Sequence, residues 1–219
     1  MIDLIIFDCD GVLIDSEIIS ADTLISELAL IGITIDRHYV RKYCLGRSFP
    51  TVAKSLREQF DTPLPDDFEQ RYRSSLLHRF ETQLEATQGI ETLLETLDLP
   101  ICVATSSSPP RVARSLELTG LARFFGPHVF TASQVKNGKP APDLFLFAAK
   151  EMGVEPSRTL VIEDSIPGLN AAQSAGMPHL AYTGASHLRG LGVEMPDGVQ
   201  AFDNWADFTQ VLKTIKEAP

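Results

Sequence analysis

Residues 4–16 read LIIFDCDGVLIDS, and this stretch decides the fold. It opens with a continuous apolar run, which is typical of a strand buried on both faces of a parallel sheet. The run stops at Asp8, and the sequence Asp8-Cys9-Asp10-Gly11 predicts a polar turn where the strand ends. Ligands of open α/β sheets bind at the carboxyl ends of the strands, so Asp8 and Asp10 are candidate site residues.

The chain changes character twice after this strand. From Ser16 to about Leu84 the pattern is helical, with Ser16 as a candidate N-cap and no convincing strand. From Gly89 onward, short apolar runs alternate with helical segments. Strands are predicted at residues 100–104, 129–131, 159–162 and 179–182, and helices at residues 90–97, 109–120, 142–153 and 167–175.

Repeated strand–helix units predict a parallel sheet that is covered by helices on both faces. The predicted fold class is therefore α/β, with a Rossmann-like parallel-sheet core and an all-helical domain inserted after the first strand. We assign residues 1–14 and 86–219 to the core, and residues 15–85 to the insertion.

Polar residues also follow two later strands of the predicted sheet. Thr105 and Ser106 come after the second strand, and Glu163 and Asp164 come after the fourth. Lys139 lies in a loop ahead of a predicted helix. One polar strand end could arise by chance, but three strand ends and a lysine at the same edge of a sheet predict a single site.

These groups suit phosphoryl transfer, which needs a nucleophile, positive charge around the phosphoryl group and a proton for the leaving oxygen. Asp8 and Asp10 can reach the same region, so one can attack while the other exchanges a proton. Repulsion from Asp8 should raise the pKa of Asp10. The carboxylates of Asp8 and Asp164 are oxygen ligands of the kind that Mg²⁺ prefers. Thr105 can hold phosphate oxygens, and Lys139 can neutralise their charge.

Four short motifs of the chain resemble those of a known superfamily. Residues 8–16 resemble the first motif of the haloacid dehalogenase superfamily, and Thr105 with Ser106, Lys139 and residues 163–165 match the later motifs in order. The chain looks most like the β-phosphoglucomutase and sugar-phosphatase branch, whose helical cap domain is inserted after the first motif. This resemblance implies that residues 15–85 form such a cap, and that the protein is a phosphatase.

The resemblance also implies a role for each matching carboxylate. Asp8 would be the nucleophile that becomes a phosphoaspartate, and Asp10 would be the general acid and base. A Mg²⁺ cofactor would bind to Asp8, to the backbone carbonyl of Asp10 and to Asp164. Glu163 would act near the metal through a water molecule.

The remaining site residues implied by the resemblance contact the substrate. Thr105, Ser106 and Lys139 would position the phosphoryl group. Gly46 and Arg47 lie in a cap loop that faces the active site in relatives, so we expect them to help in selecting the substrate. The resemblance points to a sugar phosphate or a sugar-acid phosphate.

Two sets of basic residues are predicted to lie outside the chemistry. Arg71, Arg73, His78 and Arg79 are expected on the exposed face of a cap helix. His187, like the other histidines, lacks the spacing of a metal ligand and is expected to have no role in the site.

Two other functions fit parts of the pattern. A phosphosugar mutase of the β-phosphoglucomutase type uses the same core, but those relatives carry an arginine where this chain has Phe49 and a histidine where it has Ser20, so hydrolysis is favoured. A receiver-like signalling module also combines aspartates, a hydroxyl and a lysine around Mg²⁺. Receivers are much shorter and have no place for the helical insertion.

Bulk composition narrows the partners. The chain has 219 residues with 29 acidic and 19 basic side chains, a formal net charge of −10, which argues against binding to nucleic acid or an anionic membrane. No signal peptide or membrane span is predicted. Cys9, Cys44 and Cys102 are expected to be reduced thiols. We therefore expect a cytoplasmic monomer that acts on a small-molecule phosphate ester.

Overall fold

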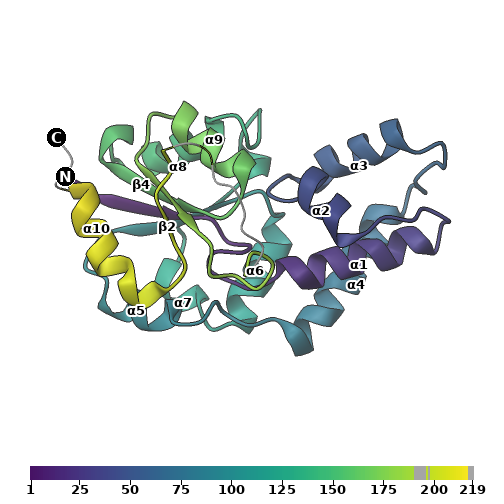
Figure 1. Ribbon diagram of the computed structural model, residues 1–219, viewed down its shortest axis with the longest axis horizontal. Coiled ribbons are helices and arrows are strands. Elements are labelled where there is room, and N and C mark those ends of the chain that lie inside the picture. The colour runs from purple at the N-terminus through teal and green to yellow at the C-terminus, as the bar shows by residue number, and fades with distance from the viewer. Residues whose placement is uncertain (190–195, 197, 217–219) are drawn as a thin grey trace.

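The computed structural model describes residues 1–189, 196 and 198–216 of the chain (Figure 1). Its centre is a six-stranded parallel sheet with the strand order β3-β2-β1-β4-β5-β6. This order places β1 in the middle, between β2 and β4. The strands are β1 (Leu4–Phe7), β2 (Ile101–Thr105), β3 (Val129–Thr131), β4 (Thr159–Glu163), β5 (His179–Tyr182) and β6 (Ala201–Phe202).

Helices cover both faces of the sheet, because alternate residues of each buried strand point to opposite sides. Ile5 and Phe7 belong to one apolar cluster and Leu4 and Ile6 to the other. The first face is covered by α5 (Ile90–Thr96), α6 (Pro109–Leu118), α7 (Ala122–Phe125) and α10 (Phe208–Lys216). The second face is covered by α8 (Asp143–Glu151) and α9 (Ile166–Ser174).

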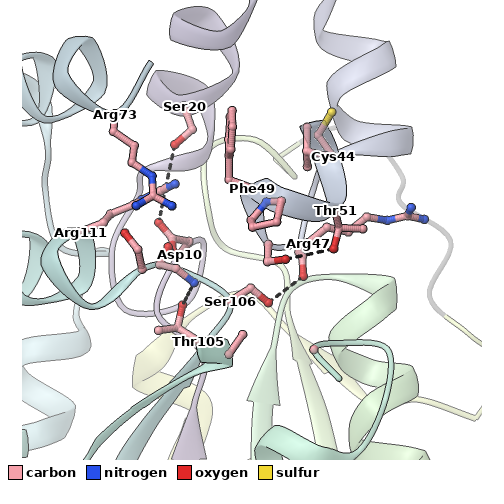
Figure 2. Close-up of a pocket in the computed structure, with 18 of the residues that line it drawn as sticks. Asp10, Ser20, Cys44, Arg47, Phe49, Thr51, Arg73, Thr105, Ser106 and Arg111 are labelled. Atoms are coloured by element: carbon pink, nitrogen blue, oxygen red, sulfur yellow. Dashed lines mark hydrogen bonds and ion pairs between the residues drawn. The ribbon is translucent and has the colours of Figure 1, made fainter. Parts of the chain in front are cut away.

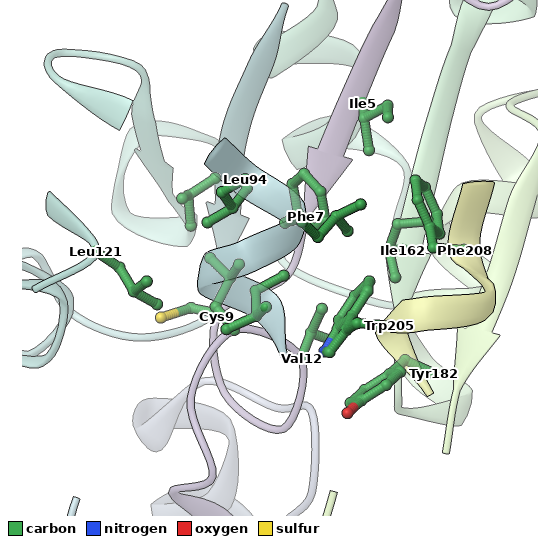
Figure 3. Packing of buried hydrophobic residues seen from close by; sticks show 14 of the residues in the cluster. Ile5, Phe7, Cys9, Val12, Leu94, Leu121, Ile162, Tyr182, Trp205 and Phe208 are labelled. Carbon is green, nitrogen blue, oxygen red and sulfur yellow. The ribbon is translucent and has the colours of Figure 1, made fainter. Parts of the chain in front are cut away.

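Aromatic packing fixes the carboxyl end of β1. The ring of Phe7 lies 6.3 Å from that of Phe125 and 6.1 Å from that of Trp205, which stacks on Tyr182 at 4.3 Å (Figure 3). The indole N–H of Trp205 donates to Thr87 Oγ1 at 3.0 Å, so its buried polar group is paired. Rigid packing beside Phe7 holds the residue that follows it, Asp8, in place.

The chain between β1 and α5 forms a separate helical layer. Its helices are α1 (Glu17–Ala29), α2 (Arg37–Tyr43), α3 (Phe49–Gln59) and α4 (Phe68–Gln83). They share a hydrophobic cluster of their own, which is distinct from the two clusters on the sheet. In Figure 1, the sheet and these helices lie at opposite ends of the long axis, and β1 runs toward the helices.

Polar pairs join α1 to α4 and correct one prediction. Arg71 pairs with Glu27 at 3.2 Å, and Arg79 donates to Thr23 Oγ1 at 3.1 Å. These arginines are half-buried against α1, so the prediction that they lie on an exposed helix face was wrong, although His78 is exposed. The sequence pattern could not show this, because the partners of these arginines on α1, Thr23 and Glu27, lie far away along the chain.

The predicted elements largely agree with the observed ones. The predicted strands at residues 129–131 and 179–182 coincide with β3 and β5, whereas β6 and α10 were not predicted. Ser16 precedes α1 as expected, but its hydroxyl donates to Asp10 Oδ1 at 2.6 Å and does not cap the helix. Among the described residues, no helix combines the length and the apolar character needed to cross a membrane.

Candidate active site

The central strands deliver the predicted carboxylates and hydroxyls to one edge of the sheet. Asp8 follows β1, Thr105 ends β2, and Glu163 ends β4 with Asp164 directly after it. The backbone N–H of Asp8 donates to the carbonyl of Ile162 at 3.0 Å, which extends the β1–β4 pairing by one residue. The three strand ends therefore converge where the sequence predicted a site.

Lys139 lies at the centre of this group. Its Nζ donates to Asp8 Oδ1 and to Glu163 Oε1, each at 2.7 Å, and its side chain is only 1% exposed. Burial alone would lower the pKa of Lys139, but the two carboxylates outweigh burial and raise it. The loop that carries this lysine is held by Asp143, whose Oδ1 accepts from the backbone and side-chain N–H groups of Asn137. Lys139 is thus a fixed positive charge beside Asp8.

Glu163 is fully buried, and every hydrogen bond it makes is local to the site. Besides Lys139, its Oε2 accepts from the backbone N–H groups of Asp164 and Ser165, both at 2.8 Å, and from Ser165 Oγ at 2.9 Å. Glu163 thereby orders the loop after β4 and orients Lys139. A contact with a metal through water stays a prediction for this residue.

Three buried carboxylates form a candidate cation site. Ligand oxygens of Asp8, Glu163 and Asp164 all lie within 4.8 Å of one another. Burial raises the pKa values of Asp8 and Asp164 well above the ordinary range, and neighbouring carboxylates add to this while Lys139 opposes it. Asp164 Oδ2 is buried, and within the described part of the chain no hydrogen-bond donor is aligned on it. An excess of buried acceptors over cations fits a hard divalent ion such as Mg²⁺.

His187 lies beside this cluster, although the sequence gave no reason to expect it. Its Nε2 is 3.0 Å from Asp164 Oδ2, but the two atoms are not aligned as a hydrogen bond. Burial lowers the pKa of His187, which favours the neutral ring. Gly11 faces the same carboxylate with φ of +78°, and a Cβ on it would collide with Asp164. Only glycine fits this turn.

Asp10 has three close donors on its carboxylate. Ser16 Oγ, Ser107 Oγ and Arg111 Nη2 each lie 2.6 Å from one of its oxygens. Burial would raise the pKa of Asp10, but Arg111 and the two hydroxyls outweigh it, and the pKa is lowered. The prediction of a raised pKa, based on Asp8 alone, was wrong. Arg111 lies in α6, far along the chain, and no local pattern connects it to Asp10.

The hydroxyls after β2 link the sheet to the helical layer. Thr105 is buried, and its Oγ1 accepts from the backbone N–H of Ser107 at 3.1 Å. Ser106 Oγ donates to the carbonyl of Gly46 at 3.1 Å (Figure 2). Gly46 belongs to the loop between α2 and α3, so it reaches the sheet as predicted for a loop that faces the site.

A cavity of about 650 Å³ lies between the sheet edge and the helical layer. Asp8, Asp10 and Thr105 line it from the sheet, together with Gly46 and Ser106. From the helical layer, it is lined by Phe49 and Tyr72, which are stacked with ring centroids 5.0 Å apart. The cavity therefore offers polar groups at the strand ends and an aromatic wall opposite them.

The cavity is lined by the predicted arginine, Arg47, and by two arginines that were not predicted to lie there. Arg47 is exposed, and in Figure 2 its guanidinium points away from Asp10. Arg73 and Arg111 also line the cavity, and both extend toward Asp10 in the same view. Sequence reasoning missed both, because α4 and α6 are brought together only by the tertiary fold.

Comparisons with known proteins agree with this architecture. The family profile of the haloacid dehalogenase-like hydrolases matches residues 2–176. A 6-phosphogluconate phosphatase from Escherichia coli strain K12 is 29% identical over 177 residues, which cover 80% of each chain. A probable pseudouridine-5′-phosphatase from Drosophila melanogaster is 32% identical over 209 residues, covering 88% of this chain and 89% of the relative.

A solved structure shares the complete fold. A haloacid dehalogenase-like protein of unknown function from Agrobacterium tumefaciens strain C58 is 32% identical, with a TM-score of 0.80. The alignment covers 99% of this chain and 100% of that one. The similarity therefore extends over both the sheet and the helical layer.

Proposed function

The chain belongs to the haloacid dehalogenase-like hydrolases, and from this membership we propose that it is a magnesium-dependent phosphatase that forms a phosphoaspartate at Asp8. One observation carries the proposal. The Asp8 carboxylate lines the cavity and at the same time contacts Lys139 and the cluster of Glu163 and Asp164. The Asp8 carboxylate would thus be a nucleophile that lies next to both the positive charge of Lys139 and a candidate metal site. Phosphoryl transfer requires this combination of groups.

In the first step, a carboxylate oxygen of Asp8 attacks the phosphorus of the substrate. The bond between phosphorus and the ester oxygen breaks, and Asp10, once protonated, gives its proton to the leaving oxygen. Lys139 neutralises charge on the transferred group. The product alcohol then leaves, and the phosphoryl group remains on Asp8.

In the second step, water attacks the phosphorus of the phosphoaspartate. Asp10 accepts a proton from this water, the bond between phosphorus and the Asp8 oxygen breaks, and inorganic phosphate is released. Asp8 returns to its carboxylate form and Asp10 to its protonated form. Thr105 and Ser106 are the proposed phosphate-binding hydroxyls, with the backbone N–H groups that follow them.

The residues fit a resident Mg²⁺. Asp8, Asp164 and the backbone carbonyl of Asp10 would hold it, and Glu163 would support the loop that carries Asp164. When bound, the ion supplies positive charge beside the phosphoryl oxygens and beside Asp8. An ion held by these buried carboxylates would also account for Asp164 Oδ2, which has no aligned hydrogen-bond donor among the described residues.

We assign the helical layer, residues 15–85, to a cap domain and residues 1–14 and 86–219 to the catalytic core. The hydrogen bond from Ser106 to Gly46 supports a cap loop that closes on the core. Closure of this kind excludes bulk water from the cavity and helps to select the substrate. Arg47 remains a proposed substrate contact only after a rotation of its side chain, because its guanidinium is exposed.

Hydrolysis is favoured over a phosphosugar mutase. Ser20 and Phe49 stand where mutase relatives carry a histidine and an arginine. Ser20 accepts from Arg111 Nη2 at 2.9 Å, and Phe49 stacks on Tyr72, so neither offers a cation to a second phosphate. The named activities of the two relatives are phosphatase activities, which supports a sugar phosphate or sugar-acid phosphate as substrate. We further propose that the protein is a cytoplasmic monomer, and its net charge of −10 supports a function without nucleic acid or anionic membrane as partner.

The test is phosphate release from a panel of phosphorylated metabolites with and without Mg²⁺. Chelation should abolish release, Mg²⁺ should restore it, and Ca²⁺ should restore it poorly because its larger, more flexible coordination disturbs in-line geometry. Full activity in excess chelator would refute the metal assignment.

A second assay distinguishes hydrolysis from the mutase reaction. The protein is given β-glucose 1-phosphate with catalytic glucose 1,6-bisphosphate, and the formation of glucose 6-phosphate is compared with the release of phosphate. Formation of glucose 6-phosphate about tenfold faster than release of phosphate would identify a mutase.

A further inference from the structure

Arg111 has donors that the protein itself does not use. Its Nη2 contacts Asp10 Oδ1 at 2.6 Å and Ser20 Oγ at 2.9 Å, and its guanidinium lies 5.5 Å from the ring centre of Phe80. Its Nε is buried, and no acceptor among the described residues pairs with it. A guanidinium carries five N–H donors, and a buried donor without a partner costs about 1–3 kcal/mol. Nε itself is buried, but the Arg111 side chain is 18% exposed and lines the cavity, so a ligand in the cavity can approach the guanidinium.

A second guanidinium faces the same space. Arg73 lines the cavity from α4, where it forms an ion pair with Glu69, and in Figure 2 it extends toward Asp10. Glu17 also lines this cavity, but burial and the Asp10 carboxylate raise its pKa to about 8. Near neutral pH, Glu17 is therefore mainly protonated and adds no negative charge to the Asp10 and Glu69 carboxylates that pair with these two arginines.

The position of Arg111 decides where its ligand would lie. Under the proposed function, Asp10 acts on the leaving oxygen of the substrate. Because Arg111 touches Asp10 and lines the same cavity, an anion bound to it would lie nearer to the leaving group than to the transferred phosphoryl group. The aromatic wall of Phe49 and Tyr72 lines the same cavity.

Resting on the proposed function, we propose that Arg111, together with Arg73, binds a second anionic group on the leaving-group side of the substrate. A planar guanidinium matches a carboxylate or a phosphate with two parallel hydrogen bonds. The enzyme would therefore select phosphate esters that carry a second anion, either a carboxylate or another phosphate.

Matched substrate pairs test this directly. Each pair differs in the second anion alone: 6-phosphogluconate against glucitol 6-phosphate, 3-phosphoglycerate against glycerol 1-phosphate, and fructose 1,6-bisphosphate against fructose 6-phosphate. We expect kcat/KM to be at least about tenfold higher for the doubly anionic member of at least one pair, the size of effect that a charge-assisted hydrogen bond provides. The first two pairs report a carboxylate and the third a phosphate.

Variants separate selection from a merely structural role. Arg111→Gln should reduce the preference within the pair by about tenfold or more, chiefly by raising KM for the doubly anionic member, and Arg73→Gln should reduce it less. Arg111→Lys should retain part of the preference, because lysine keeps the positive charge but cannot donate two parallel hydrogen bonds to one anion. Arg114→Gln is the matched control. Arg114 lies on the same helix and binds Glu81 on α4, outside the cavity, so its loss should leave the preference unchanged.

Three results would overturn the inference. Equal kcat/KM within every pair would overturn it while leaving the phosphatase assignment intact. An Arg111→Gln variant that loses the same factor on both members of the pair would show that Arg111 only supports Asp10. If the wild-type protein released no phosphate from any substrate, including p-nitrophenyl phosphate, the proposed function would fail and this inference with it.

Discussion

Single residues in this site carry charges whose behaviour is decided by their neighbours. Asp8 and Asp10 are two residues apart, yet burial raises the pKa of Asp8, while Arg111 and two hydroxyls lower that of Asp10 in spite of its burial. This is the reverse of the order that the proposed roles of Asp8 as nucleophile and Asp10 as acid require. A cation beside Asp8 would lower its pKa and so restore the order needed for attack.

Glu17 gives a pH dependence that can be measured without substrate. Burial and Asp10 raise its pKa from an ordinary 4.5 to about 8. Between these values the native state binds a proton that the unfolded state has released, so the free energy of unfolding falls as pH rises through this window. We expect the Glu17→Gln substitution to abolish this fall in the free energy of unfolding, because glutamine does not titrate. Relative to wild type, the variant should gain on the order of 2 kcal/mol between pH 5 and pH 8, about 4–8 °C in Tm.

The measurement is thermal unfolding of both proteins across this pH range in chelator, so that metal binding does not contribute. Wild-type and variant Tm values should be similar near pH 5 and diverge toward pH 8. Parallel curves for the two proteins would contradict a raised pKa at Glu17.

Residues with a local signature were predictable, and residues placed by tertiary packing were not. Asp8 directly follows an apolar strand, and Lys139 lies in a recognisable motif, so the sequence identified both. Arg73, Arg111 and His187 reach the site from helices and loops whose own patterns look ordinary. Their positions depend on how α4, α6 and the segment after β5 pack, which one sequence does not reveal.

At the scale of elements, the loop between α2 and α3 packs closely against the loop after β4, and the residue at this contact is Gly46. Gly46 has φ of +71°, and a Cβ on it would lie 2.7 Å from the Cβ of Ser165. Its carbonyl accepts from Ser106. Both its conformation and its close approach therefore require glycine, and the cavity closes at this contact.

We expect Gly46→Ala to push this loop off the sheet edge and to lower kcat/KM by tenfold or more. The left-handed conformation alone costs a residue with a Cβ about 1–2 kcal/mol. Gly32→Ala is the matched control, because Gly32 has φ of +80° but no atom within 4 Å of its Cβ position. The control should lose similar stability and keep its activity. Equal activity losses in the two variants would contradict a specific role for the Gly46 contact.

The elements that were predicted share a strong local pattern. β1 and β5 are short apolar runs between polar residues, which the sequence shows directly. β6 consists of two residues, an exposed alanine and a buried phenylalanine, and therefore has no apolar run to detect. It forms only because β5 offers an edge to pair with.

At the scale of the whole molecule, the sheet with its two hydrophobic clusters and the helical layer with a third lie on either side of the cavity. The sheet with its covering helices fixes Asp8, the proposed nucleophile, and the helical layer borders the cavity on the opposite side. The fold class could be predicted because strand–helix alternation implies a parallel sheet. The strand order, and hence which strand ends lie next to Asp8, became visible only in the structure.

The central claim is that Asp8 is transiently phosphorylated, and trapping that state tests it most directly. The Asp10→Asn variant is suited to this, because an activated aryl phosphate needs no proton on its leaving group, whereas release of phosphate from Asp8 needs Asp10 as a base. The variant is mixed with p-nitrophenyl phosphate and Mg²⁺, quenched in acid and reduced with borohydride, and the reduced aspartate is located by peptide mass spectrometry. We expect the reduced residue at Asp8, and none in the Asp8→Asn, Asp10→Asn double variant. A burst of p-nitrophenol with Asp8 unmodified, or with the modification on another residue, would contradict the account.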